Sequence, residues 1–373
     1  MKRIEFNPDE LTIIGSYQDS GETDAFRRLG FTTVPGGPKR KWPVTPRENF
    51  ILRLQGKTPF WIPYSGVLNS DVRFFFPRMN EEFIVRHMIV DAEPRYNYVS
   101  NIMKSSWFDL EWEYVPAVGG ATVRPGAPKV SDINHWEDEV SVPKIEDFDF
   151  EDCFNKNSDF LIKDKLNGST IFTGFWERLI SLMDVENAAI AMIDDEQKPG
   201  VHRLFDKLAD FYCDYITKMQ KTFNLDIFQI HDDWVHQRST FFSAATAHEM
   251  LMPYLKRVAD CCHSLGILLE IHSCGKNESM VPVYIESGID MWSPQPINDI
   301  AFLVKEYKSS GLIFGVPEPY IPEDATNTQV REIAQQFVED YKCYNIVAAF
   351  NAPPQFFIDS VYEFSRKAFL AFD

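Results

Sequence analysis

The sequence predicts a (β/α)8 barrel, the TIM-barrel fold, with an N-terminal arm and an aromatic-rich insertion after the first strand. From about residue 155 onward, short apolar segments alternate with amphipathic ones. This alternation predicts parallel strands joined by right-handed helical crossovers. The 373 residues are enough for one barrel of roughly 250 residues with additional segments. A doubly wound open sheet is the alternative, but no Gly-x-Gly-x-x-Gly motif follows the first strand, which disfavours nucleotide binding.

The first barrel elements are predicted by local signals. Thr45, Pro46 and Glu48 fit the N-cap, first and third positions of a helix with a capping box. Apolar residues follow at helical spacing, and Gly56 ends the helix. The apolar run at 58–64 then predicts a buried strand.

The other strands and helices follow in regular order. The predicted strands are 170–173, 226–230, 267–271, 290–292, 312–316 and 346–350. The predicted helices are 176–193, 201–223, 243–265, 280–287, 297–308 and 328–341. Together with the strand that ends at Tyr64, the number of strands approaches the eight of a closed barrel.

We expect residues 1–373 to form a single domain. Residues 1–43 have weak signals and are interpreted as an N-terminal arm, whereas 70–155 are interpreted as an insertion within the barrel. A hairpin is predicted at 111–124. The aromatic side chains of the insertion, such as Trp107 and Trp112, are typical of core or interface packing. The alternative is a lid over a flat, apolar substrate.

Composition excludes several classes of partner. The net charge of −18 and the isoelectric point near 4.9 argue against nucleic-acid binding, which needs a basic face. The first residues contain no signal-peptide core, and no run approaches the ~20 apolar residues of a membrane span. Six cysteines without a framework spacing suggest reduced thiols. We therefore expect a cytoplasmic protein, and a homodimer stays open.

The apolar strand at 267–271 leads into the clearest chemical signal of the chain. Because side chains alternate along a strand, His272 and Cys274 leave on the same face. Imidazole nitrogen and thiolate sulfur are preferred zinc ligands, and Gly275 permits a sharp turn. The alternative is that both residues are ordinary parts of the core.

Polar residues follow several other predicted strands. A barrel enzyme carries its chemistry at the carboxyl ends of its strands. The residues at these ends are Tyr64, His231, Asp232, Asp233, Trp234, Gln295, Glu318 and Asn351. Of the two adjacent acids, we expect one to face the barrel mouth as a proton donor or ligand, and the other to cap a helix or pair with a cation. Gln295 and Glu318 are equally well explained as loop residues, and the role of His231 stays open.

Two stretches resemble a known family. Asp232-Asp233-Trp234-Val235-His236-Gln237 and His272-Ser273-Cys274-Gly275 resemble the uroporphyrinogen decarboxylase superfamily, most closely its cobalamin-dependent methyltransferases and O-demethylases. The resemblance implies a TIM barrel in which His272 and Cys274 bind zinc and a third ligand is a Cys near the last strand. Residues 347–354 contain no Cys, and Asn351 lies at or near that place. The missing ligand is then an oxygen from Asp232, Asp233 or Glu318, or else the metal is weakly bound or absent.

The resemblance implies a methyltransferase that moves a methyl group from a small donor to a corrinoid protein. An aromatic methyl ether is the preferred donor, because the insertion is rich in aromatic residues and the site lacks an evident cluster of cations. Zinc acts as a Lewis acid on the ether oxygen, and Asp232 or Asp233 protonates the departing phenolate. The expected substrate-binding residues are Tyr64, Trp234, Gln295 and Asn351.

One alternative is a decarboxylase-type lyase acting on a carboxylate substrate. It is disfavoured because no arginine lies between Tyr64 and Arg73 to hold carboxylates. Another alternative is a non-catalytic subunit that binds a corrinoid or a metal.

Overall fold

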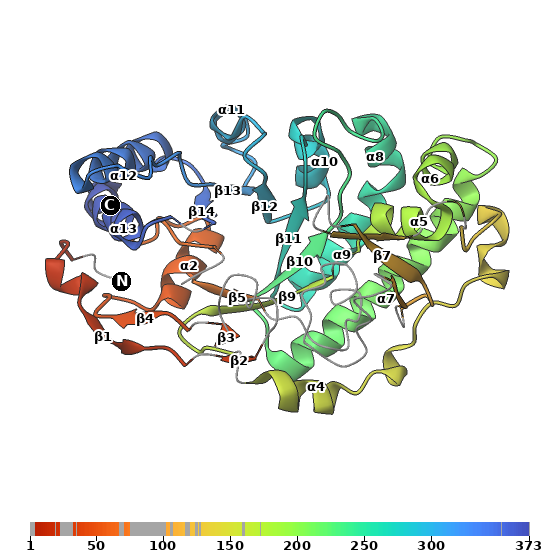
Figure 1. Cartoon of the computed structure of the whole chain (residues 1–373), viewed down its shortest axis with the longest axis horizontal. Helices are drawn as coiled ribbons and strands as arrows, with labels where there is room; N and C mark the ends of the chain where they lie inside the picture. The colour runs from red at the N-terminus through yellow and green to blue at the C-terminus, as the bar shows by residue number, and fades with distance from the viewer. Residues whose placement is uncertain are drawn as a thin grey trace.

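The main sheet contains seven parallel strands. The computed structural model describes residues 4–18, 20–22, 33–34, 36–66, 71–74, 102–104, 107–115, 120–123, 126, 128–158, 161–171, 173–351 and 353–372. The strands, in spatial order, are β14 (Ile346–Ala348), β13 (Ile313–Val316), β12 (Met291–Pro294), β11 (Leu268–Ser273), β10 (Ile227–His231), β9 (Leu166–Ile171) and β5 (Val72–Phe74). Helices surround this sheet on its outside (Figure 1). The predicted TIM-barrel fold is confirmed.

An eighth position links the two edge strands. Tyr64 forms an isolated parallel bridge with Ala348 of β14, and the Ser65 amide donates to the Ala348 carbonyl over 2.8 Å. The Asp71 amide, directly before β5, donates to the Tyr64 carbonyl over 2.8 Å. Hydrogen bonds therefore continue from one edge of the sheet to the other through the segment at Tyr64.

The predicted strand at 58–64 forms only this one bridge. Pro59 and Pro63 have no amide hydrogen to give to a ladder. The amides of Phe60 and Trp61 instead donate to the side chain of buried Asn49, over 2.6 and 3.2 Å. These two amides therefore bond to a side chain of α2 and not to a neighbouring strand. The segment packs in the position of a strand but forms no ladder of backbone hydrogen bonds.

The helices follow the strands in the predicted order. They are α2 (Pro46–Leu54), α4 (Phe150–Asn157), α5 (Phe175–Met183), α6 (Val185–Ala191), α7 (Lys198–Phe223), α8 (Ala244–Met250), α9 (Met252–Ser264), α10 (Val281–Glu286), α11 (Ile300–Glu306), α12 (Asn327–Tyr341) and α13 (Gln355–Phe369). The short 3-10 helices are η1 (Pro8–Leu11), η2 (Ile133–Asp138), η3 (Ile145–Asp147), η5 (Glu278–Met280) and η6 (Leu370–Phe372). No helix within the described residues is long and apolar enough to cross a bilayer.

Local sequence signals explain where the helices agree with the predicted boundaries and where they differ from them. The capping box of α2 is present, with the Glu48 amide donating to the Thr45 hydroxyl and the Thr45 amide donating to the Glu48 carboxylate. The predicted helix 176–193 is divided into α5 and α6 at Asp184, which has a φ of 64° and caps α6. The predicted helix 243–265 is divided into α8 and α9 near Leu251, and Pro253 lies in the first turn of α9.

The barrel interior is arranged in layers. The layer nearest the amino-terminal ends of the strands is apolar and contains Val72, Leu166, Ile227, Met291, Ile313 and Val347. Above it, the Ser293 hydroxyl donates to Glu270 over 2.5 Å, and burial raises the pKa of Glu270 to about 7. Next along β10 and β11, toward their carboxyl ends, come His231 and His272. The interior thus changes from apolar to polar along the strands, toward the end where a barrel carries its chemistry.

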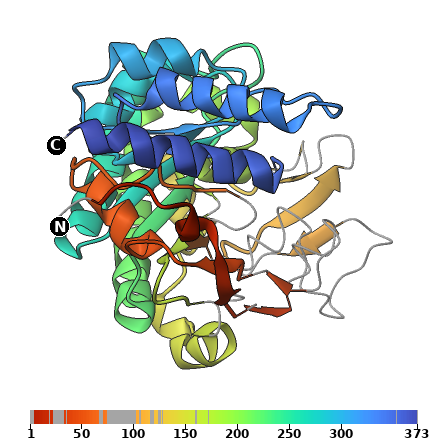
Figure 2. The same ribbon diagram turned by 90° about the vertical axis from the view of Figure 1, so that its left-hand side faces the viewer.

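The N-terminal arm is tied to the last long helix. The arm contains η1 and the antiparallel pair β1 (Ile13–Ser16) and β4 (Pro38–Arg40), near α13 in Figure 2. Glu10 accepts two hydrogen bonds of 2.8 Å from the Arg366 guanidinium and one of 2.7 Å from the Tyr362 hydroxyl. This pair is buried, so its geometry fixes the arm firmly against α13. A second small antiparallel pair is formed by β2 (Ser20–Glu22) and β3 (Thr33–Val34).

The segment predicted as an insertion contributes β5 to the main sheet. It also contains the antiparallel sheet β6 (Ile102–Lys104), β7 (Glu111–Val115) and β8 (Gly120–Val123), in which β7 and β8 form the predicted hairpin. Trp107 is fully buried, and its ring lies 5.0 Å from that of Phe211 and 5.5 Å from that of Tyr215, both on α7. Phe108 and Trp112 are buried as well. These aromatic residues pack as core and do not line an open pocket.

Asp71, which joins Tyr64 to β5, makes the stability of the fold pH-dependent. Burial raises the pKa of Asp71 from 3.8 to about 6. The folded state therefore holds this proton more tightly than the unfolded chain, so the associated stability is present below about pH 4 and is lost as the pH rises through 6. We expect Asp71→Asn to gain up to about 3 kcal/mol relative to wild type between pH 4 and pH 7. Urea unfolding at both pH values measures this, and a pH-independent difference would contradict it.

Candidate metal centre

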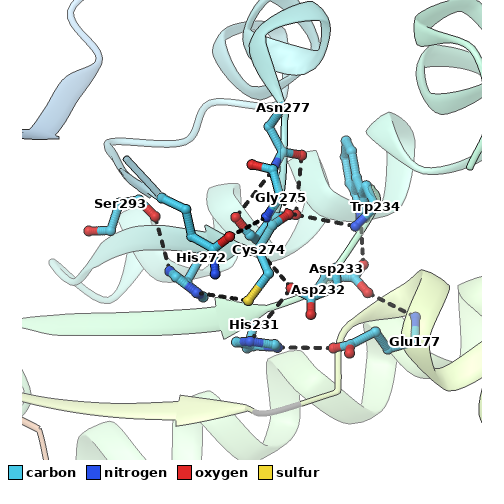
Figure 3. A network of polar contacts seen from close by, with 12 residues as sticks. Glu177, His231, Asp232, Asp233, Trp234, His272, Cys274, Gly275, Asn277 and Ser293 are labelled. Carbon is cyan, nitrogen blue, oxygen red and sulfur yellow. Dashed lines mark hydrogen bonds and ion pairs between the residues drawn. The ribbon is translucent and has the colours of Figure 1, made fainter. Parts of the chain in front are cut away.

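Three side chains converge at the carboxyl ends of β10 and β11. The parallel register pairs His231 with His272, and the two ring centroids lie 5.1 Å apart. Cys274 lies two residues beyond His272, and its sulfur is 3.6 Å from His272 Nε2. One ligand atom from each of the three residues lies within 4.8 Å of the others (Figure 3). The sequence expectation that His272 and Cys274 face the same site agrees with this arrangement.

The arrangement fits a zinc ion. Zinc bonds of about 2.3 Å to sulfur and about 2.0–2.1 Å to nitrogen, at a tetrahedral angle, place the two ligand atoms roughly 3.6 Å apart. His272 Nδ1 lies 3.0 Å from the Ser293 carbonyl, and His231 Nδ1 lies 3.1 Å from Glu177 Oε2. Because each Nδ1 donates its hydrogen to an oxygen, each Nε2 presents a lone pair to the site when its ring is neutral. Two nitrogens and one sulfur form a donor set that zinc prefers.

The protons of the three groups are distributed unevenly in the metal-free chain. Burial alone lowers the pKa of His231, but the carboxylates of Asp233 and Glu177 raise it to about 10. Burial and the neighbouring His231 lower the pKa of His272 to about 4. Burial raises the pKa of the Cys274 thiol. Metal binding therefore displaces protons from His231 and Cys274, whereas His272 is already neutral.

The first of the two adjacent acids caps a helix. Asp232 is buried, and its carboxylate accepts hydrogen bonds of 3.0, 3.1 and 2.9 Å from the amides of Phe175, Trp176 and Glu177. These amides form the first turn of α5, where the helix dipole favours a negative charge. A fourth bond of 2.8 Å comes from Trp234 Nε1. Burial and the charge of Glu177 raise the pKa of Asp232 to about 7, although the hydrogen bonds from Glu177, Trp234 and Trp176 oppose this.

The second acid faces the site. Asp233 Oδ1 accepts a hydrogen bond of 2.6 Å from the Cys274 amide and lies 3.6 Å from His231 Nε2. The residue is partly exposed. Asp232 thus lies at a helix end, and Asp233 lies beside the three candidate ligands.

Two glycines permit these close approaches. A Cβ at Gly174 would lie 2.5 Å from the carboxylate carbon of Asp232, so only glycine leaves room for the cap. Gly275 has a φ of 80°, and a Cβ there would lie 2.7 Å from the carbonyl oxygen of His236. The turn after Cys274 therefore needs glycine for both its backbone conformation and its packing.

The other predicted site residues have structural contacts. Trp234 is fully buried, and Tyr64 is buried against Phe350 at a ring distance of 5.5 Å. Gln295 Oε1 accepts from the Gly275 amide over 2.8 Å and so fixes the turn after Cys274. Glu318 Oε2 accepts from the Asn351 amide over 2.8 Å.

The expectation that Glu318 completes the metal site is not supported by this geometry. Glu318 is absent from the clusters of ligand-type side chains within the described residues. His231 is the third member of the cluster with His272 and Cys274, because its strand is the direct neighbour of β11, whereas Glu318 follows β13, two strands away.

Sequence reasoning did not assign His231 or Glu177 to the site. A signal for His231 was present. Ile227, Gln229 and His231 are two residues apart, so their side chains lie on the same face if the predicted strand continues to His231. The sequence contains no comparable signal for Glu177, which lies in the first turn of a helix and reaches His231 only in three dimensions.

Comparison with known proteins identifies the family. Residues 160–357, more than half of the chain, match the family model described as uroporphyrinogen decarboxylase (URO-D). The chain belongs to the URO-D family. The matched residues of this URO-D family member include His231, His272 and Cys274. A search of curated proteins found no match.

Solved structures agree with the fold of this URO-D family member. A methyltransferase from Methanosarcina mazei is 13% identical with a TM-score of 0.54, and the match covers 88% of this chain and 99% of that one. A B12-independent methionine synthase from Shewanella sp. W3-18-1, in complex with selenomethionine, is 12% identical with a TM-score of 0.37, covering 62% and 68%. The similarity to the Methanosarcina structure shows a shared fold. The TM-score of the Shewanella structure is too low to support a conclusion about this chain.

The cap on α5 is testable by comparing two adjacent acids. Asp232→Ala leaves three helix amides and one indole N–H without their acceptor, so we expect a loss of about 3 kcal/mol or more in the free energy of unfolding. Asp233→Ala removes the acceptor of the Cys274 amide and serves as the matched control with a smaller loss. Urea denaturation compares both variants with wild type. Equal losses would show that Asp232 is not the dominant cap.

Proposed function

We propose that this URO-D family member is a methyltransferase that demethylates a small methyl donor and passes the methyl group to a corrinoid protein. The observation that carries the proposal is the convergence of His231, His272 and Cys274 on one point. Zinc bound there would supply a Lewis acid for the donor's heteroatom. The Methanosarcina neighbour is named a methyltransferase, which supports this branch of the family.

The surrounding residues hold the ligands in position. Glu177 and the Ser293 carbonyl fix the orientation of the two imidazole rings, and Gln295 fixes the turn that carries Cys274. Such outer contacts raise ligand basicity and reduce the rearrangement needed when a metal binds.

Asp233 is the group we assign to proton transfer. It is partly exposed beside the ligands, whereas Asp232 is buried and engaged by four donors. A proton delivered by Asp233 to the leaving oxygen would neutralise the charge that develops there.

An aromatic methyl ether is the donor we propose. Support comes from an aromatic surface on the segment after β10, where Phe241 is partly exposed and its ring centroid lies 5.6 Å from that of Trp176. An exposed ring held in this way offers a face on which an aromatic substrate can stack. A cytoplasmic location belongs to the same proposal and is supported by the absence of any disulfide among the six cysteines.

The metal assignment predicts a defined loss of zinc. We expect His231→Ala, His272→Ala and Cys274→Ser each to weaken zinc binding by at least 100-fold, and Glu177→Gln to weaken it by 10–100-fold through His231. Competition with a chromophoric chelator measures the affinity. His263→Ala and Cys343→Ser are matched controls outside the centre and should keep the wild-type value. Unchanged zinc binding in His231→Ala would reject its role as a ligand.

The reaction assignment predicts methyl transfer from methoxylated aromatic compounds to reduced corrinoid. The absorbance change of the corrinoid measures this transfer. We expect Asp233→Asn to retain zinc but to react 10²–10⁴-fold more slowly, because the proton donor is lost. Zinc-loaded protein that fails to transfer a methyl group from any donor would reject the proposal, and release of carbon dioxide from a porphyrinogen would establish the decarboxylase alternative.

A further inference from the structure

Two cysteines face each other between neighbouring helices, outside the metal centre. Cys213 lies on α7 and Cys261 on α9. The Cys261 sulfur is 3.7 Å from the Cys213 carbonyl oxygen, and the Cys213 sulfur is 3.9 Å from the Arg257 carbonyl oxygen. Arg257 lies one helical turn before Cys261, so each sulfur lies against the helix that carries the other. Each thiol also influences the pKa of the other.

The environment gives the two thiols different reactivity. Interaction with the Cys213 side chain, together with a weaker contact from the Thr217 hydroxyl at 3.9 Å, lowers the pKa of Cys261 to about 7 against the effect of burial. The same interaction raises the pKa of Cys213. Thiolate is the nucleophilic form of cysteine, so Cys261 attacks first and Cys213 stays protonated.

Accessibility distinguishes this pair from the neighbouring thiol. Cys213 and Cys261 are partly exposed, whereas Cys262 is fully buried, and burial raises its pKa. A small oxidant therefore reaches the pair but not Cys262. Cys274 lies beyond the opposite end of β11 from Cys261, which makes the pair separate from the zinc ligands.

We propose that Cys213 and Cys261 form a reversible disulfide in exchange with a small-molecule disulfide such as oxidised glutathione. The Cys261 thiolate attacks one glutathione sulfur, forms a mixed disulfide and releases glutathione thiolate. Cys213 then loses its proton, attacks the Cys261 sulfur and releases the second glutathione. Two protein thiols are oxidised by two electrons, and one glutathione disulfide is reduced to two thiols.

The bond would connect helices that lead directly into the metal centre. α7 precedes β10, which carries His231, and α9 precedes β11, which carries His272. A cross-link between them restricts the unfolded chain and resists separation of these two βα units. Oxidation at this position would therefore stabilise the strands of the site without consuming a ligand.

The test uses the full-length protein in mixtures of oxidised and reduced glutathione. After the free thiols are blocked, trypsin and a glutamate-specific protease are used because cleavage after Glu270 separates Cys262 from Cys274. Mass spectrometry is expected to find a Cys213–Cys261 linked peptide that disappears with dithiothreitol. The link should persist in Cys262→Ser and Cys343→Ser and be absent in Cys213→Ser and Cys261→Ser.

The linked peptides found by mass spectrometry in the wild-type protein decide the outcome even if a variant fails to fold. Glutathione held on Cys261 while Cys213 stays reduced would overturn the proposal. A Cys261–Cys262 link, or loss of the cross-link in Cys262→Ser, would overturn it as well. None of these readouts depends on methyl transfer or on the metal site being correctly assigned.

Discussion

The parallel hydrogen-bond ladder between β10 and β11 is the constraint on which the site depends. It places His231 directly beside His272, and the two-residue period of the strand then adds Cys274 on the same face. Because both strands are flanked by further parallel strands, the three side chains cannot move apart without disturbing the sheet. The donor set is therefore arranged by the backbone before any metal binds.

A second level of order comes from polar contacts around the ligands. Ser293 connects two layers, since its carbonyl accepts from His272 and its hydroxyl donates to Glu270. Glu177 has a similar double role, because its side chain accepts from His231 while its amide is capped by Asp232. The candidate ligands and the helix cap thus belong to one network (Figure 3).

Most of the fold and part of this site follow from local sequence. Strand periodicity predicts the shared face of His272 and Cys274, and the capping box predicts the start of α2. The third member of the cluster depends on which strands are neighbours, so proximity along the sheet brings His231 rather than Glu318 to His272 and Cys274. The role of Asp232 depends on amides more than fifty residues earlier in the chain, a relation that no local pattern contains.

The junction between Tyr64 and Ala348 of β14, called the seam below, has a consequence for the motions of the barrel. Every other junction of the main sheet is a ladder of two or more paired residues, whereas β14 meets the segment before β5 through the single bridge at Ala348. Sub-global opening starts where the fewest backbone bonds must break. The amide of Ser65 should therefore exchange with solvent sooner than those within β10 and β11, and the barrel would open at this seam while its metal ligands stay together.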